Sequence, residues 1–350
     1  MRAAVLRGGE IVVRDDVPEP EPGVGQVLVE VEACGICGSD LHFAQHGGTM
    51  LDLGRQMKGM PDLGDVGPSE TDLSRDVFMG HEFSATVLDT GPDTEALPAG
   101  TTVTSLPVLM STTGFEPIVY CNDIPGGYSE RMLLSAPMLL EVPNGLDARH
   151  AALTEPMAVG LHAVNKSEIQ QGNGALVLGC GPVGLAVIAA LQVRGIDPIV
   201  AADFSAARRA TAEKMGAHVT VDAAQESAFD AWAREGGGKP VVVFEAIGVP
   251  GILDEALRDA PQHAKILVVG VCMERDSVVP FYGAAKELSI QFAMAYDPME
   301  FASCLRAIAE GEIDVAPMIT GEVDLAGIPQ AFDDLADPEE HCKILVVPGS

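Results

Sequence analysis

The chain has 350 residues, of which 47% are hydrophobic and 21% are charged. This length predicts two domains, and the composition excludes a disordered chain. The 51 acidic residues outnumber the 21 basic ones and give a formal net charge of −30. A surface of this charge repels nucleic acid and anionic membranes, so we expect neither as a partner.

The first residues and the cysteines indicate a cellular compartment. No apolar run reaches the roughly 18 residues needed to cross a bilayer, and the apolar stretch within residues 1–9 is too short for a secretory signal. The seven cysteines are scattered and odd in number, which is typical of reduced thiols rather than of a disulfide framework. We therefore expect a cytoplasmic protein.

The first 150 residues have the pattern of β-structure. Apolar and polar residues alternate over 27–33 and 83–88, which predicts strands. Glycine and proline turns follow at 21–23 and 125–127. The region is typical of a partly open β-barrel.

From residue 151 the pattern changes to strands that alternate with helices. Such alternation predicts βαβ units and a parallel sheet. The helices are expected at 151–165, 183–194, 205–215, 225–234 and 252–259, and the strands at 175–179, 198–203, 218–221, 241–246 and 265–271.

The tail from about residue 288 is mixed and ends in a strand at 343–347. This strand has no obvious partner in the middle of the chain, so we expect it to return to the first domain. The predicted domains are therefore residues 1–150 with 289–350, and residues 151–288.

Residues 179–184, GCGPVG, fit the pattern G-x-G-x-x-G between a predicted strand and a predicted helix. The glycines let the backbone approach a pyrophosphate at the helix N-terminus. An acidic residue ends the next strand, where its carboxylate can accept both ribose hydroxyls and repel a 2′-phosphate, so NAD(H) is favoured over NADP(H). Two arginines nearby, Arg208 and Arg209, leave dual specificity or a solvated helix face open. The candidate cofactor residues are Gly179, Gly181, Pro182, Val183, Gly184, Asp203 and Arg208.

Cysteine, histidine and glutamate residues in the first part of the chain predict a metal site. Cys34 and Cys37 form one C-x-x-C pair, but no second pair exists, which excludes a structural site of four cysteines. The remaining candidates are His81, Glu82 and Glu155. One thiolate, one imidazole and carboxylates leave a position for water or a substrate oxygen, as in catalytic zinc sites.

These motifs together resemble the zinc-dependent medium-chain dehydrogenase/reductase family. They cover nearly the whole chain in the family's order: CGSDLH at 37–42, GHEF at 80–83, EP at 155–156, GCGPVG at 179–184 and FEAIG at 244–248. The resemblance implies an α/β plus β protein, with a GroES-like partly open barrel and a Rossmann domain. Glu155 in place of a cysteine is similar to the branch of sorbitol, butanediol and threonine dehydrogenases.

The resemblance also implies how the metal is held. Cys37 and His81 would be zinc ligands, and Glu155 the third protein ligand, directly or through water. Glu82 would exchange with water at the metal or lie beside it. Asp40 would hold the far nitrogen of His81.

Further roles follow from the same resemblance. Ser39 would take the alcohol proton and His42 would relay it outward. Gly248 and Val271 would join the residues that bind NAD(H). A homodimer or homotetramer is implied, assembled through the edge of the Rossmann sheet near 268–279.

The sequence departs from the family pattern in two places. No cysteine lies between 98 and 120, where the family has a lobe with four of them, so we expect one catalytic zinc and no structural zinc. Cys37 and His81 are 44 positions apart (81 − 37), longer than usual. The insertion, roughly 48–77, could cover the pocket or only extend the surface.

The predicted function is a zinc-dependent oxidoreductase that transfers a hydride between NAD(H) and a small molecule. The substrate would be a secondary alcohol, a vicinal diol or a polyol, or the matching ketone. Two alternatives are a zinc-free quinone or enone reductase of the same fold, which lacks such a ligand set, and a non-enzymatic role like that of lens crystallins of this fold.

Overall fold

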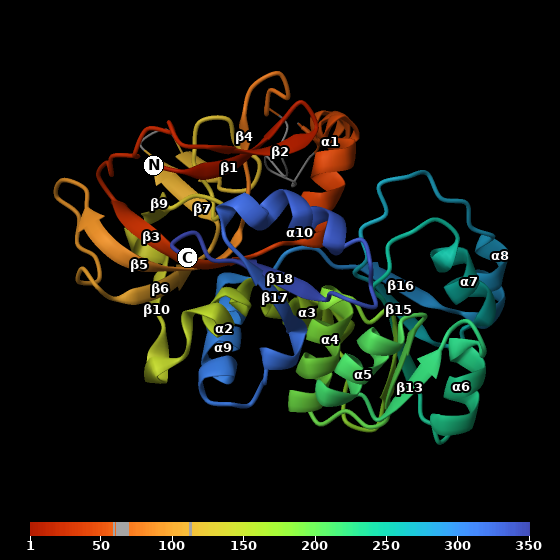
Figure 1. The fold of residues 1–350 in the computed structure, drawn as a ribbon. Helices are drawn as coiled ribbons and strands as arrows, with labels where there is room; N and C mark the ends of the chain where they lie inside the picture. The colour runs from red at the N-terminus through yellow and green to blue at the C-terminus, as the bar shows by residue number, and fades with distance from the viewer. Residues whose placement is uncertain (59, 61–69, 112–113) are drawn as a thin grey trace. The chain divides into compact units, whose positions relative to one another are not determined.

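The computed structural model describes residues 1–58, 60, 70–111 and 114–350. The chain forms two compact units (Figure 1). The first holds residues 1–155, 319–337 and 343–350, and the second holds residues 156–318 and 338–342.

This division differs from the predicted one at 289–318 and 338–342, which the structure groups with the second unit, and at 151–155, which it groups with the first. Strand β16 (Ser289–Phe292) pairs in parallel with β15 (Lys265–Val268) and extends the same sheet. Helix α9 (Pro298–Ala309) follows in the same unit. The sequence pattern stops alternating near residue 288, but the sheet continues by one more strand.

The first unit is built around β3 (Gln26–Gly35), which pairs antiparallel with β5 (Glu82–Thr90). The last strand, β18 (Lys343–Val346), pairs with the end of β3, as predicted for the tail. Within the described residues these strands belong to a seven-stranded sheet in the order β10-β6-β5-β3-β18-β17, with β9 also on β3. The other strands of this unit are β1 (Ala3–Arg7), β2 (Glu10–Arg14), β4 (Val77–Phe78), β6 (Thr102–Ser105), β7 (Val108–Ser111), β8 (Gly114–Pro117), β9 (Arg131–Ser135), β10 (Leu139–Glu141) and β17 (Ile319–Val323).

Helix α1 (Gly38–Met57) follows β3 directly and was not predicted. It contains glycines at 47 and 48, which are weak helix formers, and its backbone departs from helical geometry at His46. Both features hide the helical period. Its buried positions include Phe43, Gly47, Leu51 and Gly54, which lie on one face. The second half of α1 begins the predicted insertion, and residues 59 and 61–69 of that insertion lie outside the described residues.

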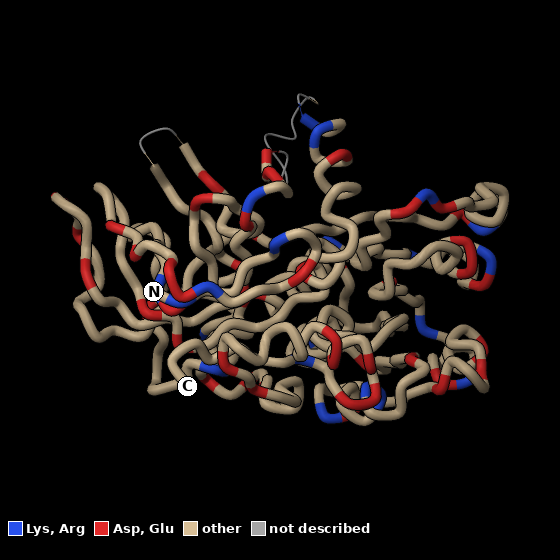
Figure 2. The backbone as a smooth tube through the Cα atoms, turned by 45° about the horizontal axis from the view of Figure 1, so that its top comes forward, with Lys and Arg blue, Asp and Glu red and all other residues tan. Residues whose placement is uncertain are grey.

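Two further helices complete the first unit, α2 (Ala148–Ala152) and α10 (Ile328–Asp334). Among the described helices of the chain, none is long and apolar enough to cross a membrane. Acidic residues are distributed along the backbone of both units, and the chain has more of them than of basic residues (Figure 2).

The second unit holds a parallel six-stranded sheet, in the order β13-β12-β11-β14-β15-β16 within the described residues. This is the order 3-2-1-4-5-6 of a Rossmann fold, whose ligands bind at the carboxyl ends of the strands. The alternation predicted over 175–271 is confirmed, with shifts of a few residues. The elements are α3 (Thr154–Ser167), β11 (Gly174–Leu178), α4 (Pro182–Val193), β12 (Ile199–Asp203), α5 (Ala206–Lys214), β13 (Val219–Asp222), α6 (Ala228–Glu235), β14 (Val241–Glu245), α7 (Ile252–Asp259) and α8 (Pro280–Lys286).

The edge of this sheet does not lie where the resemblance implied. Strand β15, which begins the expected edge segment 268–279, is paired on both sides, by β14 and β16. Strand β16 is the edge strand, and its Ile290 and Phe292 are exposed. The edge of the sheet therefore lies one strand later in the chain than the segment expected at 268–279.

Candidate functional site

Three of the predicted metal ligands come together in the first unit. Cys37 precedes α1, His81 lies between β4 and β5, and Glu82 begins β5. One ligand atom of each lies within 4.8 Å of the others. The register of the sheet explains this, because Gly35 at the end of β3 lies opposite Glu82.

Two glycines give the cluster its space. A Cβ atom on Gly35 would lie 2.0 Å from Oε2 of Glu82. Gly80 has a φ of +94°, and a Cβ there would lie 2.7 Å from the backbone nitrogen of Tyr128. Neither position accepts a side chain without moving the cluster.

Asp40 lies behind His81 and is fully buried. Its Oδ1 lies 3.5 Å from Nδ1 of His81, and its Oδ2 accepts hydrogen bonds from the Cys37 backbone at 3.1 Å and the Tyr128 hydroxyl at 2.7 Å. With Nδ1 facing a carboxylate, Nε2 of His81 is the nitrogen left for a ligand. A thiolate, an imidazole and a carboxylate fit zinc, and Asp40 supplies the usual support for the imidazole.

The charges of this cluster depend on one another. Burial would raise the pKa of Asp40, but His81 and the hydrogen bonds lower it below its usual value. Burial would lower the pKa of His81, but Asp40 and Cys37 raise it well above its usual value. The negative partners around the imidazole therefore stabilise a positive charge on His81 itself.

The sequence analysis missed the partner of Glu82. Nζ of Lys343 donates to both carboxylate oxygens of Glu82, at 2.8 and 2.7 Å, and to the carbonyl oxygen of Ile36 at 2.9 Å. Both charged side chains are 1% exposed. The only signal in the sequence is a lysine at the start of the apolar last strand.

Tyr120 is a second residue that the sequence analysis missed. Its ring stacks on Phe43 at 3.9 Å and meets His81 edge-on at 6.5 Å. Its hydroxyl is buried and interacts with the Ser39 side chain, which lowers the pKa of Tyr120, although no hydrogen bond of ordinary geometry forms among the described residues. Burial raises the pKa of Tyr120 well above its usual value, and the charges of Asp40, Cys37 and Glu155 raise it further. The phenol therefore lies among the acidic groups of the cluster.

The other predicted residues of the first unit lie around this cluster. Oγ of Ser39 donates to Sγ of Cys37 at 3.2 Å. His42 follows on α1 with an exposed side chain. Glu155, at the start of α3, is half-buried and is not one of the three residues whose ligand atoms meet. Its charge still reaches Tyr120.

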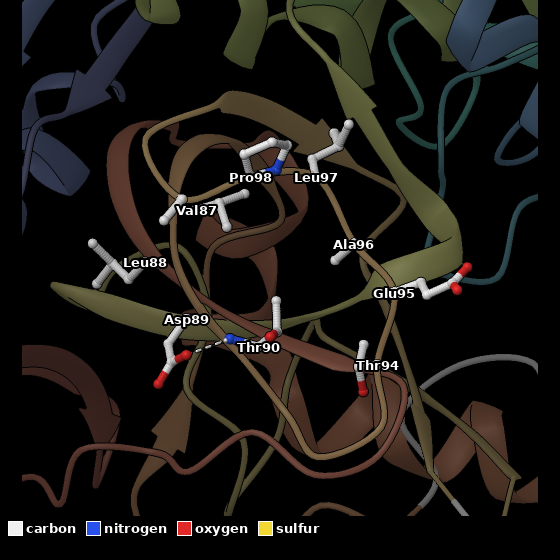
Figure 3. A pocket seen from close by; sticks show the side chains of 10 residues that line it. Val87, Leu88, Asp89, Thr90, Thr94, Glu95, Ala96, Leu97 and Pro98 are labelled. Atoms are coloured by element: carbon white, nitrogen blue, oxygen red, sulfur yellow. Dashed lines mark hydrogen bonds between the residues drawn. The ribbon is translucent and has the colours of Figure 1, made fainter.

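A separate hollow of about 390 Å³ lies in the same unit (Figure 3). It is lined by residues 87–90 and 94–99, from the end of β5 and the loop after it. The Asp89 carboxylate accepts the Thr90 backbone N–H at 2.8 Å. Because none of the predicted ligands lines this hollow, it is not the candidate site.

The glycine-rich turn of the second unit has the geometry of a phosphate-binding loop. Gly179 has a φ of +91°, and a Cβ on Gly184 would lie 1.9 Å from the carbonyl oxygen of Gly179. The position of a Cβ on Gly181 is open, and Nη1 of Arg208 is the nearest atom, at 3.9 Å. Two glycines thus close the turn and the third leaves room for a ligand at the start of α4. Helix α4 begins at Pro182, and Val183 is its second residue.

Asp203 ends β12 beside this turn. Its Oδ2 accepts from the backbone of Cys180 at 2.7 Å, and its Oδ1 from the backbone of Ser205 at 2.8 Å. These bonds fix the carboxylate at the end of the strand, where a Rossmann fold binds the adenosine ribose.

Glu245 ends β14 and was not predicted as a site residue. Its Oε1 accepts from the backbones of Ile247 and Gly248 at 2.7 and 2.8 Å, although only 3% of the residue is exposed. Gly248 has a φ of +73° and packs on the backbone of Val271. The buried carboxylate therefore holds the loop that carries Gly248, one of the predicted cofactor residues.

Comparison with known proteins gives the same two parts. Residues 23–144 match the family model of the alcohol dehydrogenase GroES-like domain, and residues 182–310 match that of the zinc-binding dehydrogenase. These matches confirm the predicted barrel and Rossmann pairing.

The similar proteins cover the whole chain. The (R,R)-butanediol dehydrogenase of Bacillus subtilis is 29% identical over 100% of both chains, and the sorbitol dehydrogenase of Bos taurus is 28% identical over 94% of this chain and 91% of that one. A putative zinc-binding dehydrogenase from Sinorhizobium meliloti, solved bound to NADP, has a TM-score of 0.82 at 27% identity and covers 99% of both chains. The chain belongs to the zinc-dependent medium-chain dehydrogenase/reductase family.

Proposed function

We propose that this dehydrogenase binds one catalytic zinc and no structural zinc, and that it interconverts a secondary alcohol, vicinal diol or polyol with the matching ketone, using NAD(H). The observation that supports it most is the cluster of Cys37, His81 and Glu82 with Asp40 behind the imidazole. Glu155 is the proposed further ligand, directly or through water. A zinc-free reductase does not require this set of metal ligands.

In the proposed mechanism each side chain has one task. A bound zinc ion would polarise the substrate oxygen and lower the pKa of the alcohol. Ser39 accepts the hydroxyl proton from its position beside Cys37, and His42, exposed on the same helix, passes it to solvent. A bound nicotinamide ring would accept the hydride. Asp203 favours NAD(H), because its carboxylate accepts ribose hydroxyls and repels a 2′-phosphate.

The first test measures metal and turnover on the same sample. Elemental analysis is expected to give one zinc per chain, and removal of zinc with a chelator is expected to abolish NAD-dependent oxidation of diols and polyols. Readdition of zinc should restore the activity. Two zinc ions per chain, or full activity without zinc, would refute the proposal.

Tyr120 is the proposed contact for a second hydroxyl of the substrate. Its hydroxyl is buried and close to the cluster, and its interaction with Ser39 does not reach ordinary hydrogen-bond geometry among the described residues. Leaving such a group incompletely paired is costly unless a ligand supplies a partner. Tyr120→Phe keeps the stacking on Phe43 and removes only this oxygen. We expect kcat/KM for a vicinal diol to fall about tenfold, corresponding to one hydrogen bond of about 1.4 kcal/mol. The kcat/KM for a simple secondary alcohol should change less than about twofold, and equal losses for both substrates would contradict this role.

We also propose a homodimer or homotetramer, with strand β16 at the interface. Phe292 is 68% exposed on this edge strand, and Phe281 is 72% exposed in α8 of the same unit. An edge strand with unpaired backbone groups and exposed aromatic side chains is suited to pairing with another copy. Light scattering on the purified chain measures this state directly.

A further inference from the structure

A short segment near the C-terminus, residues 338–342, belongs to the second unit, although the residues on both sides of it belong to the first. It lies against the start of α5. Oγ of Ser205 donates to the carbonyl oxygen of Pro338 at 2.9 Å. The backbone N–H groups of Ala206 and Ala207 donate to the two carboxylate oxygens of Glu339, at 3.0 and 3.3 Å. Glu339 therefore binds N–H groups that the helix itself leaves unpaired.

These N–H groups lie next to the expected ribose position. Asp203, whose counterpart in a Rossmann fold binds the 2′-hydroxyl of the adenosine ribose, accepts from the backbone of Ser205 at 2.8 Å. Ala206 and Ala207 are the next residues, and α5 also carries Arg208 and Arg209. A helix start whose N–H groups donate to an anion, with arginines nearby, is suited to bind a phosphate in place of that anion.

The fold itself does not exclude NADP, because the similar dehydrogenase from Sinorhizobium meliloti was solved bound to it. Discrimination must therefore come from particular side chains at the ribose. Asp203 is one of them, but its carboxylate also makes two backbone hydrogen bonds that hold the turn. Glu339 accepts hydrogen bonds from the N–H groups of Ala206 and Ala207, which are the donors that a phosphate at this helix start would need.

We propose that Glu339 is a specificity-determining residue, which fills the place of a 2′-phosphate with its own carboxylate. It acts in two ways, because it occupies the two N–H donors and it repels a second anion at the same helix start. This inference rests on the proposed nicotinamide cofactor. It adds to the selection made by Asp203, since Asp203 acts on the ribose hydroxyls as well as on the phosphate, whereas Glu339 acts only on the phosphate.

The test compares Glu339→Gln with Glu340→Gln. Glu340 is the next residue and is also exposed, and it makes no hydrogen bond to α5 among the contacts of the described residues. Both variants therefore remove one negative charge from the same segment, but only one removes it from the helix start. The affinities for NAD⁺ and NADP⁺ are measured by calorimetry at 0.15 M salt, together with those for AMP and adenosine 2′,5′-bisphosphate, which carry the 2′ position without the nicotinamide.

We expect Glu339→Gln to bind NADP⁺ and adenosine 2′,5′-bisphosphate about tenfold more tightly than the wild-type chain, as expected for loss of one exposed like charge at contact distance. Its affinity for NAD⁺ and AMP should change by less than about twofold, and Glu340→Gln should change none of the four. Equal effects of the two variants, or no gain in affinity for the bisphosphate, would overturn the role of Glu339. A wild-type chain that already binds NADP⁺ as tightly as NAD⁺ would instead refute the proposed NAD preference. Binding of neither dinucleotide would refute the proposed cofactor itself.

Discussion

Ser39→Ala is expected to lower kcat by about 10²–10⁴-fold while zinc remains bound, because a positioned proton acceptor contributes that much to proton transfer. The hydroxyl of Ser39 lies 3.2 Å from the thiol of Cys37, which places it beside the proposed metal. It is not one of the ligands, so its removal should leave the metal in place. Steady-state kinetics and elemental analysis of the same preparation separate the two effects.

Matched variants make this result specific. Ser39→Thr keeps the hydroxyl and should retain far more activity than Ser39→Ala, whereas Cys37→Ser should lose zinc and activity together. His42→Ala should cost less than Ser39→Ala, because water can replace an exposed relay group, and its effect should shrink as pH rises. If Ser39→Ala keeps the wild-type kcat with zinc bound, another group takes the proton. Glu82, the carboxylate of the cluster, would then be the first candidate.

The residues of the site that could be predicted are those that lie in local motifs. Cys37, Ser39 and Asp40 lie within four consecutive positions at the start of α1, so their proximity follows from the chain itself. His81 was a candidate by residue type, but its proximity to Cys37 could not be derived from the local sequence, because it reaches the cluster through the antiparallel pairing of β3 and β5. Periodicity alone does not specify which strands pair.

The residues that escaped prediction are held by contacts between distant parts of the chain. Lys343 and Glu82 are 261 positions apart, and Tyr128 and Asp40 are 88 apart. Each pair forms only when distant segments of the first unit pack together. Neither Lys343 nor Tyr128 belongs to a recognisable motif. A buried lysine in a strand is rare unless it is paired, so Lys343 could have prompted a search for an acidic partner without identifying it.

The Rossmann unit was predictable for the opposite reason. Its strands are buried on both faces and stand in the sequence as short continuous apolar runs. Longer helical segments and turns separate these runs, so each element can be recognised within a short window. Strand β16 broke the rule, because Ser289, Ile290 and Phe292 are exposed. Because this strand is largely exposed in the isolated chain, it lacks the continuous apolar run of the other strands. The predicted domain boundary was therefore placed before it.

Lys343→Met is expected to lower the free energy of unfolding by about 3–5 kcal/mol, because it leaves the buried carboxylate of Glu82 without its partner. Both side chains are 1% exposed, and the lysine makes two hydrogen bonds to that carboxylate. Methionine keeps a similar length and removes only the charge and its donors. Urea unfolding of the zinc-free protein measures the loss.

The double variant Glu82→Gln/Lys343→Met tests whether the loss comes from an unpaired charge. It should recover a large part of the stability, because a neutral amide costs less to bury than a carboxylate. If the double variant is as unstable as Lys343→Met, the loss comes from packing of the lysine side chain and not from its charge. Zinc gives a second control, since Glu82 lies within 4.8 Å of the ligand atoms of Cys37 and His81. A cation held there would compensate part of the unpaired negative charge of Glu82, so Lys343→Met should be destabilised less when zinc is bound. An equal loss with and without zinc would place the metal away from Glu82.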